Sequence, residues 1–321
     1  MERFWMSGIL AEELVEIRHD LAALSEPGFW AVLGTFEGAW SLARFSRVSR
    51  SDFPFIDFEL QLADWNSSLG HDEYINYVKN AREEIAAGTF YQVNACRILS
   101  AEVLAGDVIS IFPRILSGNP ARYAGVLQLP GVEVISASPE RFISVQGGVV
   151  TTSPIKGTSA DGVFAEKDRA ENLMIVDLMR NDLGKVCATG SIATPRINGV
   201  EAHPGLFHLV SDVTGELLPE FTLGEVLEEL MPPGSVSGAP KSSALTMIKK
   251  WEGVRGPYCG VFGWAEGGNC ELAVAIRTFW RDGAYLKFGT GAGITWGSDP
   301  ELEWQETELK AKRLISIASG K

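Results

Sequence analysis

The sequence predicts an α+β fold in which antiparallel-rich β-sheets are faced by helices. Strand-like segments arrive in consecutive runs and helical patterns fall between the runs, whereas a doubly wound fold would alternate the two. Short glycine-containing turns separate many of the strand-like segments, which favours hairpins and meanders. Of the 321 residues, 45% are hydrophobic, so the chain has the apolar mass for a large core.

The first half of the chain contains one clear helix and several strands. Residues 1–66 include strand-like runs such as FWAVLGTF but show no functional motif. A helix is predicted from Asp72 to a glycine cap at Gly88, and its apolar face consists of Ile75, Val78, Ala81 and Ile85. Strand-like runs then occupy residues 90–99, 123–129, 132–138 and 141–153.

The second half begins with helical patterns and continues with strands. Helices are predicted at about 164–182, 223–230 and 240–251, and strands at 258–265, 270–280 and 284–290. The last helix runs toward Ile317. Ser298 and Glu301 suit a capping box at its start, and Pro300 fits its first turn.

Charge and composition exclude several classes of function. The chain has 28 basic and 41 acidic residues, a net charge of −13, and no Lys/Arg-rich block, which argues against a nucleic-acid or membrane partner. Neither a signal peptide nor a run of about 20 apolar residues is visible. Four widely spaced cysteines argue against a structural zinc site and suit a reducing compartment, so we expect a cytoplasmic protein.

Two predicted helices each carry a pair of acidic residues three positions apart. The pairs are Asp168 with Glu171 and Glu303 with Glu306, and this spacing puts both carboxylates of a pair on one helical face. If the two helices face each other, the four side chains could together hold Mg²⁺. The alternative is two solvent-exposed acidic faces, although the apolar run LMIVDLM after Glu171 argues against full exposure.

Lys156 and Glu140 are candidates for covalent and acid–base chemistry. Lys156 lies in the short segment SPIKGTS, where it could act as a point cation or, with its pKa lowered by partial burial, as a nucleophile. Glu140 begins the strand-like run that leads to Lys156, and an antiparallel meander could bring this acid beside the lysine. The alternatives are a turn lysine in solvent and an ion pair between Glu140 and Arg141.

A glycine-rich segment and an arginine could recognise an anion. The segment GTGAGI, from Gly289 to Ile294, could offer backbone N–H groups to a carboxylate, or could be a plain turn at the end of a strand. It lacks the spacing of a dinucleotide-binding loop. Arg277 interrupts an apolar strand and must therefore be paired, either with an anionic ligand or in a structural salt bridge. His208 is more typical of a satisfied core histidine than of a ligand.

Eight short motifs follow one another from about residue 72 to the C-terminus. They are SPERF at 138–142, PIKGT at 154–158, DRAENLMIVDLMRNDLG at 168–184, FHLVS at 207–211, GSVSGAPK at 234–241, AIRT at 275–278, GAGI at 291–294 and EWQET at 303–307. In this order they resemble the chorismate-utilising enzymes. The resemblance implies mixed, antiparallel-rich β-sheets packed as a sandwich with helices on the outside.

Two positions distinguish activities within this family. The resemblance implies that aminodeoxychorismate synthases carry lysine in PIKGT, as here at Lys156, whereas anthranilate, isochorismate and salicylate synthases typically carry alanine. Isochorismate-forming members activate water with a lysine, and the matching residue is Gln92. We therefore expect an aminotransferase-class enzyme that makes 4-amino-4-deoxychorismate for para-aminobenzoate and folate. An anthranilate synthase and a noncatalytic binding subunit are the alternatives.

The resemblance also assigns roles to individual residues. It implies that Lys156 attacks chorismate and that Glu140 is the general acid. Mg²⁺ would be held by Glu171 and Glu306, with Asp168 and Glu303 in support. The positions expected to contact substrate are Gly157, Thr158, Tyr258, Arg277, Gly291, Ala292 and Gly293, with Lys310 and His208 as further candidates.

The expected organisation is one catalytic unit with a partner. Residues 1–66 are predicted to be a shortened N-terminal segment that packs on a chorismate-binding domain at 67–321. The resemblance implies that ammonia comes from a separate glutamine amidotransferase subunit, because no glutaminase pattern with a nucleophilic cysteine is visible here.

Overall fold

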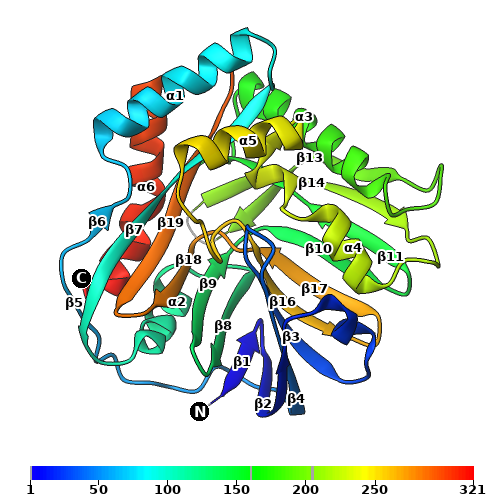
Figure 1. The fold of residues 1–321 in the computed structure, drawn as a ribbon, viewed down its shortest axis with the longest axis vertical. Coiled ribbons are helices and arrows are strands. Elements are labelled where there is room, and N and C mark those ends of the chain that lie inside the picture. Colours follow the sequence, from blue (N-terminus) through cyan, green and yellow to red (C-terminus); the bar gives the residue numbers. More distant parts are fainter. Residues whose placement is uncertain (1, 160, 204–205) are drawn as a thin grey trace.

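Hydrogen bonds join most of the strands into one long antiparallel ladder (Figure 1). The computed structural model describes residues 2–159, 161–203 and 206–321. The ladder runs, in spatial order, through β13 (Ala193–His203), β14 (Leu206–Glu216), β11 (Val149–Ser153), β10 (Arg141–Gln146), β17 (Asn269–Val274), β16 (Val261–Glu266), β3 (Phe29–Gly34), β4 (Trp40–Arg50), β2 (Ile9–Arg18), β1 (Arg3–Met6), β8 (Tyr123–Leu129), β9 (Val132–Ser138), β18 (Thr278–Asp282), β19 (Tyr285–Ile294) and β7 (Gln92–Ala105).

Shorter strands extend the ladder near its two ends. They are β12 (Ile155–Ser159) beside β14, and β5 (Gln61–Leu62), β6 (Asn66–Ser67) and β15 (Gly238–Ala239) beside β7. All of these pairings are antiparallel as well. The N-terminal strands β1 to β4 lie within the ladder, between β16 and β8, so residues 1–66 share the core of the rest of the chain.

The ladder curls so that distant strands face each other across a core. The ring of Phe4 on β1 lies 5.6 Å from the ring of Phe262 on β16, although β2, β4 and β3 separate these strands in the ladder. A Cβ on Gly125 of β8 would stand 2.5 Å from a carbon of the Phe262 ring, so only glycine allows this approach. The predicted antiparallel-rich fold with facing layers is confirmed.

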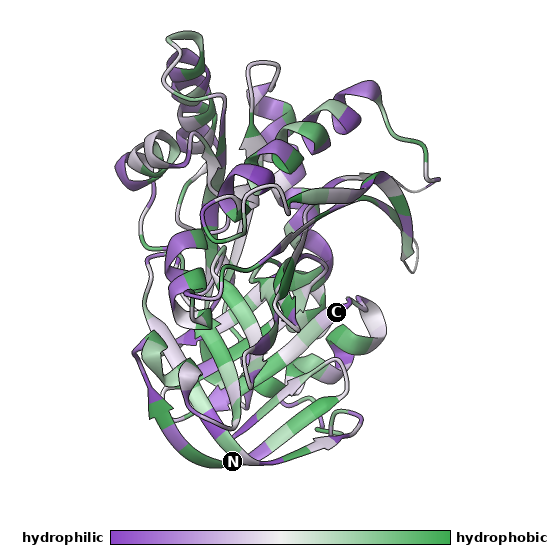
Figure 2. Ribbon diagram, turned by 90° about the vertical axis from the view of Figure 1, so that its right-hand side faces the viewer, coloured by the Kyte–Doolittle hydropathy of each residue, from purple (hydrophilic) through white to green (hydrophobic). Residues whose placement is uncertain are grey.

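The helices cover the outside of the strand layers. They are α1 (His71–Ala86), α2 (Phe112–Gly118), α3 (Glu166–Leu183), α4 (Leu223–Leu230), α5 (Lys241–Trp251) and α6 (Pro300–Ala318), with 3₁₀ turns η1 (Leu21–Ser25), η2 (Val108–Ile111) and η3 (Gly234–Val236). In Figure 1, α1, α3 and α5 lie at one end of the molecule and β1 to β4 at the other. Figure 2 shows the strands at that second end with hydrophobic and hydrophilic stretches interspersed. Within the described residues, no helix has the length and apolar character to cross a membrane.

The helix α1 shows how sequence signals set an element. Glu73 accepts a hydrogen bond from the backbone N–H of Gly70 at 2.7 Å, which caps the N-terminus, and Gly88, with φ of +79°, follows the last turn. The buried face is slightly rotated from the predicted one. It consists of Tyr74, Tyr77, Val78 and Ala81, because the two tyrosines, which the apolar count omitted, pack inward.

Two local expectations about the C-terminal third are wrong, and the structure rules out one of the two alternatives for GTGAGI. The predicted strand at 270–280 is interrupted between β17 and β18, where Arg277 adopts φ of +51°. The segment GTGAGI is not a turn, because β19 stays paired with β7 as far as Ile294. Asp299, and not Ser298, caps α6 by accepting hydrogen bonds from two backbone N–H groups.

Gly289 allows β19 to pass directly over the ring of Tyr258. A Cβ on Gly289 would lie 2.0 Å from the nearest ring carbon, whereas one on Gly253 would meet nothing within 4 Å. We expect Gly289→Ala to lower the free energy of unfolding by about 3 kcal/mol through overpacking. The control Gly253→Ala should stay close to the wild type. Urea unfolding followed by tryptophan fluorescence measures both, and equal midpoints for the two variants would contradict this account.

Candidate active site

A shift in the strand register of β12 sets the direction of the Lys156 side chain. Lys156 and Leu209 pair normally, and the register then slips so that Thr158 lies opposite His208. At the slip, Gly157 has φ of +76°, and a Cβ on it would lie 3.0 Å from the Phe164 ring, so both conformation and space require glycine. The backbone of Thr158 belongs to β12, and its side chain lies outside the described residues.

Lys156 reaches across to the end of β19. Its Nζ lies 3.5 Å from the point that a Cβ on Gly293 would occupy. Burial lowers the pKa of Lys156; the negative charge of Glu140 opposes this, and the positive charge of Lys310 adds to it. A lysine in such surroundings has more of the neutral amine that nucleophilic attack needs.

Glu140 is held in the turn between β9 and β10. Its backbone carbonyl accepts a hydrogen bond from Val274 N–H at 3.0 Å, and its N–H donates to Ser138 Oγ at 3.2 Å. The side chain is only 4% exposed and accepts a hydrogen bond from Ser235 Oγ at 2.6 Å. Burial raises the pKa of Glu140 to about 7, against the opposing effects of Ser235, Lys156 and Lys310. This carboxyl is therefore poised to exchange a proton near neutral pH.

The end of β19 presents backbone groups toward the same space. Gly291 is paired with β7, yet its carbonyl accepts a hydrogen bond from Lys310 Nζ at 3.0 Å, so it points away from that strand. In a strand, N–H and C=O of one residue point the same way and alternate along the chain. The N–H groups of Gly291 and Gly293 therefore face the site, whereas that of Ala292 is turned toward β7.

Arg277 stands where β18 separates from β19. The last described pair between these strands is Phe279 with Phe288, which leaves the edge of β19 beyond it unpaired on that side. Arg277 is half-buried, and burial lowers the pKa of its guanidinium. Its backbone carbonyl accepts from Ala137 N–H at 3.0 Å. No ion pair of the Arg277 side chain occurs among the described residues, so the structural salt bridge is not found there.

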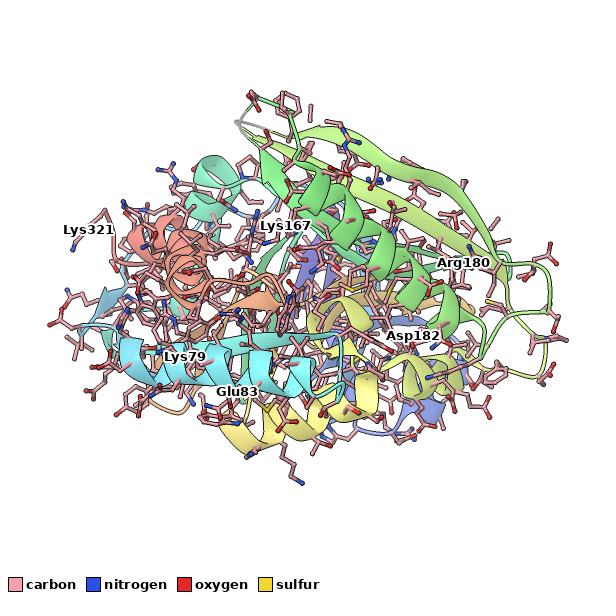
Figure 3. All side chains as sticks on the ribbon, turned by 90° about the horizontal axis from the view of Figure 1, so that it is seen from above. Lys79, Glu83, Lys167, Arg180, Asp182 and Lys321 are labelled. Atoms are coloured by element: carbon pink, nitrogen blue, oxygen red, sulfur yellow. The ribbon has the colours of Figure 1, made fainter. Side chains whose placement is uncertain are left out.

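The acidic pairs on α3 and α6 point toward one region. Glu171 and Glu306 both act electrostatically on Lys156, and each also has a lysine on its own helix. The Glu171–Lys167 distance is 3.7 Å and the Glu306–Lys310 distance is 2.6 Å. Partial burial raises the pKa of Glu306, but Lys310 outweighs it and leaves that pKa below its usual value. In Figure 3, Lys167 lies at the end of α3 nearer to α6, with Arg180 and Asp182 at the far end.

Asp168 and Glu303 are held more firmly by their surroundings than Glu171 and Glu306 are. Asp168 accepts a hydrogen bond from Ala165 N–H at 3.0 Å and so caps α3. Glu303 is 7% exposed; burial raises its pKa, while a hydrogen bond with Ser298 lowers it. Over residues 2–159, 161–203 and 206–321, no three acidic, histidine or cysteine side chains form a ready metal cluster.

Two further candidates lie behind the site. Tyr258 is buried beneath β19, and its hydroxyl lies 3.9 Å from Cys96 Sγ. His208 is buried on β14, opposite Thr158 of β12. Neither side chain is placed against Lys156 by a contact in the described structure, so a direct role in substrate binding stays a prediction.

Sequence reasoning missed Ser235, the hydrogen-bond donor to Glu140. The motif GSVSGAPK was recognised, but a serine in a short turn carries no spacing signal that marks it as the partner of an acid 95 positions away. From the sequence, Gln92 stands out only because it matches the position of the water-activating lysine in isochorismate-forming enzymes. It is 2% exposed, and its Oε1 has no hydrogen-bond partner in the described structure.

Comparison with known proteins identifies the family. The family model described as chorismate binding enzyme matches residues 57–316. The chain belongs to this chorismate-binding family. Anthranilate synthase component 1 of Saccharolobus solfataricus is 37% identical over 271 residues, covering 80% of this chain and 64% of that protein. Aminodeoxychorismate synthase component 1 of Escherichia coli is 35% identical over 277 residues, covering 82% and 61%.

Solved structures of chorismate-binding enzymes share the fold. Anthranilate synthase component I from Streptococcus pneumoniae superposes with a TM-score of 0.84 at 26% identity, covering 98% of this chain and 92% of that one. The menaquinone-specific isochorismate synthase from Escherichia coli shares the fold with a TM-score of 0.81 at 18% identity, covering 99% and 89%. The chain spans about 60% of the length of the curated relatives it matches.

The acidic side chains of this chorismate-binding chain fit Mg²⁺ in part. Mg²⁺ is usually bound by one or two protein carboxylates together with water and substrate oxygens. Glu171 and Glu306 suit this role, because each is paired only with a lysine one turn away on its own helix among the described residues. Asp168 is already engaged as a helix cap, and Glu303 is buried, so these two suit support of the site.

The raised pKa of Glu140 has a consequence for stability. The rise of this pKa from its ordinary value of 4.5 to about 7 corresponds to about 3 kcal/mol of folding free energy. That contribution is complete below pH 4.5 and is lost as the pH rises through 7, because the unfolded chain releases the proton first. We expect the stability of Glu140→Gln relative to wild type to increase by about this amount between pH 4.5 and 8, measured by urea unfolding.

A second variant, Glu225→Gln, should show the opposite dependence of stability on pH. Hydrogen bonds from Thr222 hold the pKa of Glu225 below its usual value, so Glu225→Gln should lose stability relative to wild type as the pH rises toward the usual glutamate value, with little further change from there to pH 8. A Glu140→Gln difference that is flat with pH would show that Glu140 is ionised in the folded protein.

Proposed function

We propose that the protein is an aminodeoxychorismate synthase, which converts chorismate and ammonia into 4-amino-4-deoxychorismate. The observation that carries this proposal is the juxtaposition of Lys156 and Glu140. Burial lowers the pKa of Lys156 and raises that of Glu140 to about 7, so both shifts favour the neutral amine and the protonated acid that this chemistry needs. This pairing suits covalent attack with acid assistance.

In the first step, Lys156 Nζ attacks C2 of chorismate. Both ring double bonds shift, from C1=C2 to C1=C6 and from C5=C6 to C4=C5, and the C4 hydroxyl leaves as water after Glu140 donates its proton. In the second step, ammonia adds at C4, both double bonds shift back and the C2–nitrogen bond to Lys156 breaks. Glu140, now a carboxylate, accepts the proton that the added ammonia releases. The enolpyruvyl group is retained throughout.

Cationic and backbone donors would hold the two carboxylates of chorismate. Arg277 is half-buried at the open edge of β19, and the N–H groups of Gly291 and Gly293 face the same space as Lys310. The backbone of Gly157 and Thr158 completes the set beside Lys156. Mg²⁺, held by Glu171 and Glu306 with Asp168 and Glu303 in support, would neutralise the ring carboxylate when bound.

Gln92 supports ammonia over water as the second nucleophile. Its Nε2 lies 2.9 Å from the point that a Cβ on Gly293 would occupy, close to Lys156. An amide cannot remove a proton from water at neutral pH, which disfavours water as the nucleophile, and its unpartnered Oε1 can accept a hydrogen bond that positions ammonia. The ammonia would come from a glutamine amidotransferase subunit.

Anthranilate synthesis is the second candidate function. It is favoured by the name of the Saccharolobus solfataricus relative, which is 37% identical. The two reactions use the same substrates but differ in their products, because anthranilate formation releases pyruvate and aminodeoxychorismate formation does not.

A product assay separates the two functions. Purified protein is incubated with chorismate, MgCl₂ and ammonium sulfate, and products are analysed by liquid chromatography with mass spectrometry and a coupled pyruvate assay. We expect 4-amino-4-deoxychorismate without pyruvate. Pyruvate released in step with the loss of chorismate would assign anthranilate synthesis. No turnover with ammonium or with a glutaminase partner would favour a noncatalytic binding role.

The covalent step predicts a modified lysine. Incubation with chorismate and Mg²⁺ in the absence of ammonia should add the mass of chorismate less one water to the peptide that contains Lys156. Lys241 is an internal control, because burial also lowers its pKa but it pairs with Asp182 at 3.0 Å away from the site.

One variant completes the adduct experiment. Lys156→Arg keeps the positive charge but lacks the nucleophile, so the adduct and the amination should both be lost. Wild-type turnover with no adduct at Lys156 after rapid acid quenching would contradict the covalent role.

A further inference from the structure

Among the described residues, the acceptor for the hydroxyl of Ser235 belongs to the candidate active site. Ser235 Oγ donates to Glu140 Oε1 at 2.6 Å, and the two residues are 6% and 4% exposed. Water therefore has little access to the bond, and loss of either partner would leave a buried polar group unsatisfied. Such a bond fixes the carboxyl more strongly than a surface contact would.

The backbone around Ser235 is held from several directions. Arg255 Nη1 donates to the carbonyl of Val236 at 3.0 Å, and Asn94 N–H donates to the carbonyl of Ser237 at 2.9 Å. A Cβ on Gly234 would stand 2.6 Å from a side-chain carbon of Met179 on α3. The turn η3 is thus fixed between α3, β7 and Arg255, so Ser235 cannot easily follow Glu140 if the acid moves.

The direction of this hydrogen bond determines which carboxyl oxygen carries the acidic proton. Because Ser235 donates to Oε1, that oxygen acts as an acceptor and the proton of the neutral acid belongs on Oε2. The charged groups that act on Glu140 are Lys156 from β12 and Lys310 from α6. Both belong to the candidate active site, where the proposed function needs the acidic proton.

We infer that Ser235 is a positioning residue that orients Glu140 with its acidic proton on Oε2, toward Lys156 and the substrate. This inference rests on the proposed function, in which Glu140 protonates the leaving hydroxyl. Ser235 itself does not touch the reacting atoms. Its hydroxyl also stabilises the carboxylate that remains after proton donation, since a donor to a charged oxygen favours the charged form.

The test compares three variants with wild type. Ser235→Ala removes the hydroxyl, and Ser235→Thr retains it. Ser237→Ala is the matched control, because Ser237 lies two positions away in the same turn, is buried, and donates to the carbonyl of Pro233 at 2.9 Å and not to Glu140.

Infrared spectroscopy supplies a readout that does not depend on the reaction. The protonated carboxyl band that disappears in Glu140→Gln belongs to Glu140, and its loss with rising pH gives the midpoint of that group. We expect this midpoint to rise by about one pH unit in Ser235→Ala, because a donor to the carboxylate is lost. It should remain at the wild-type value in Ser235→Thr and Ser237→Ala.

Steady-state kinetics supply the second readout. In Ser235→Ala the alkaline limb of the pH–activity profile should move to higher pH together with the infrared midpoint of Glu140. The value of kcat should fall about tenfold with little change in KM for chorismate. An unchanged midpoint in Ser235→Ala, or an equal shift in Ser237→Ala, would overturn the inference. If wild type aminates no chorismate, the proposed function fails, and the infrared midpoints still decide the role of Ser235.

Discussion

The burial of Glu140, together with the partial burial of Lys156, is the constraint on which the rest of the site depends. In water at neutral pH these side chains would form an ordinary ion pair, with neither a nucleophile nor an acid available. Burial disfavours both charges, so the pKa of the lysine falls and that of the glutamate rises to about 7. The surrounding donors and cations moderate this effect and prevent the burial of an uncompensated charge.

The antiparallel ladder brings the site residues together from distant parts of the chain. Glu140 comes from the turn before β10, Lys156 from β12, Ser235 from η3 and Gly293 from β19. The turn that holds Glu140 is fastened to the end of β17 through Val274. A slip of one residue in any of these strands would turn alternate side chains to the opposite face, so the strand register is part of the chemistry.

The sequence predicted regular elements well and irregular backbone poorly. The bounds of α4 agree with the periodic pattern because Thr222 and Glu225 form a capping box at its start. The break at Arg277 could not be predicted, because a positive φ at a non-glycine residue is imposed by tertiary contacts and leaves no local signal. The acidic pairs followed from helical spacing, whereas their roles came from the family resemblance. The partner of Glu140 required the folded structure.

The unpaired edge of β19 is protected by burial and not by a neighbouring strand. A strand edge with free backbone groups is a template for another polypeptide strand, and glycine-rich edges offer no side chains to hinder it. Here Gly291, Ala292 and Ile294 are buried, Lys310 occupies the carbonyl of Gly291, and Arg277 stands where the neighbouring strand departs. The cations that would select an anionic ligand are therefore also part of the cover that keeps this edge from pairing with another strand.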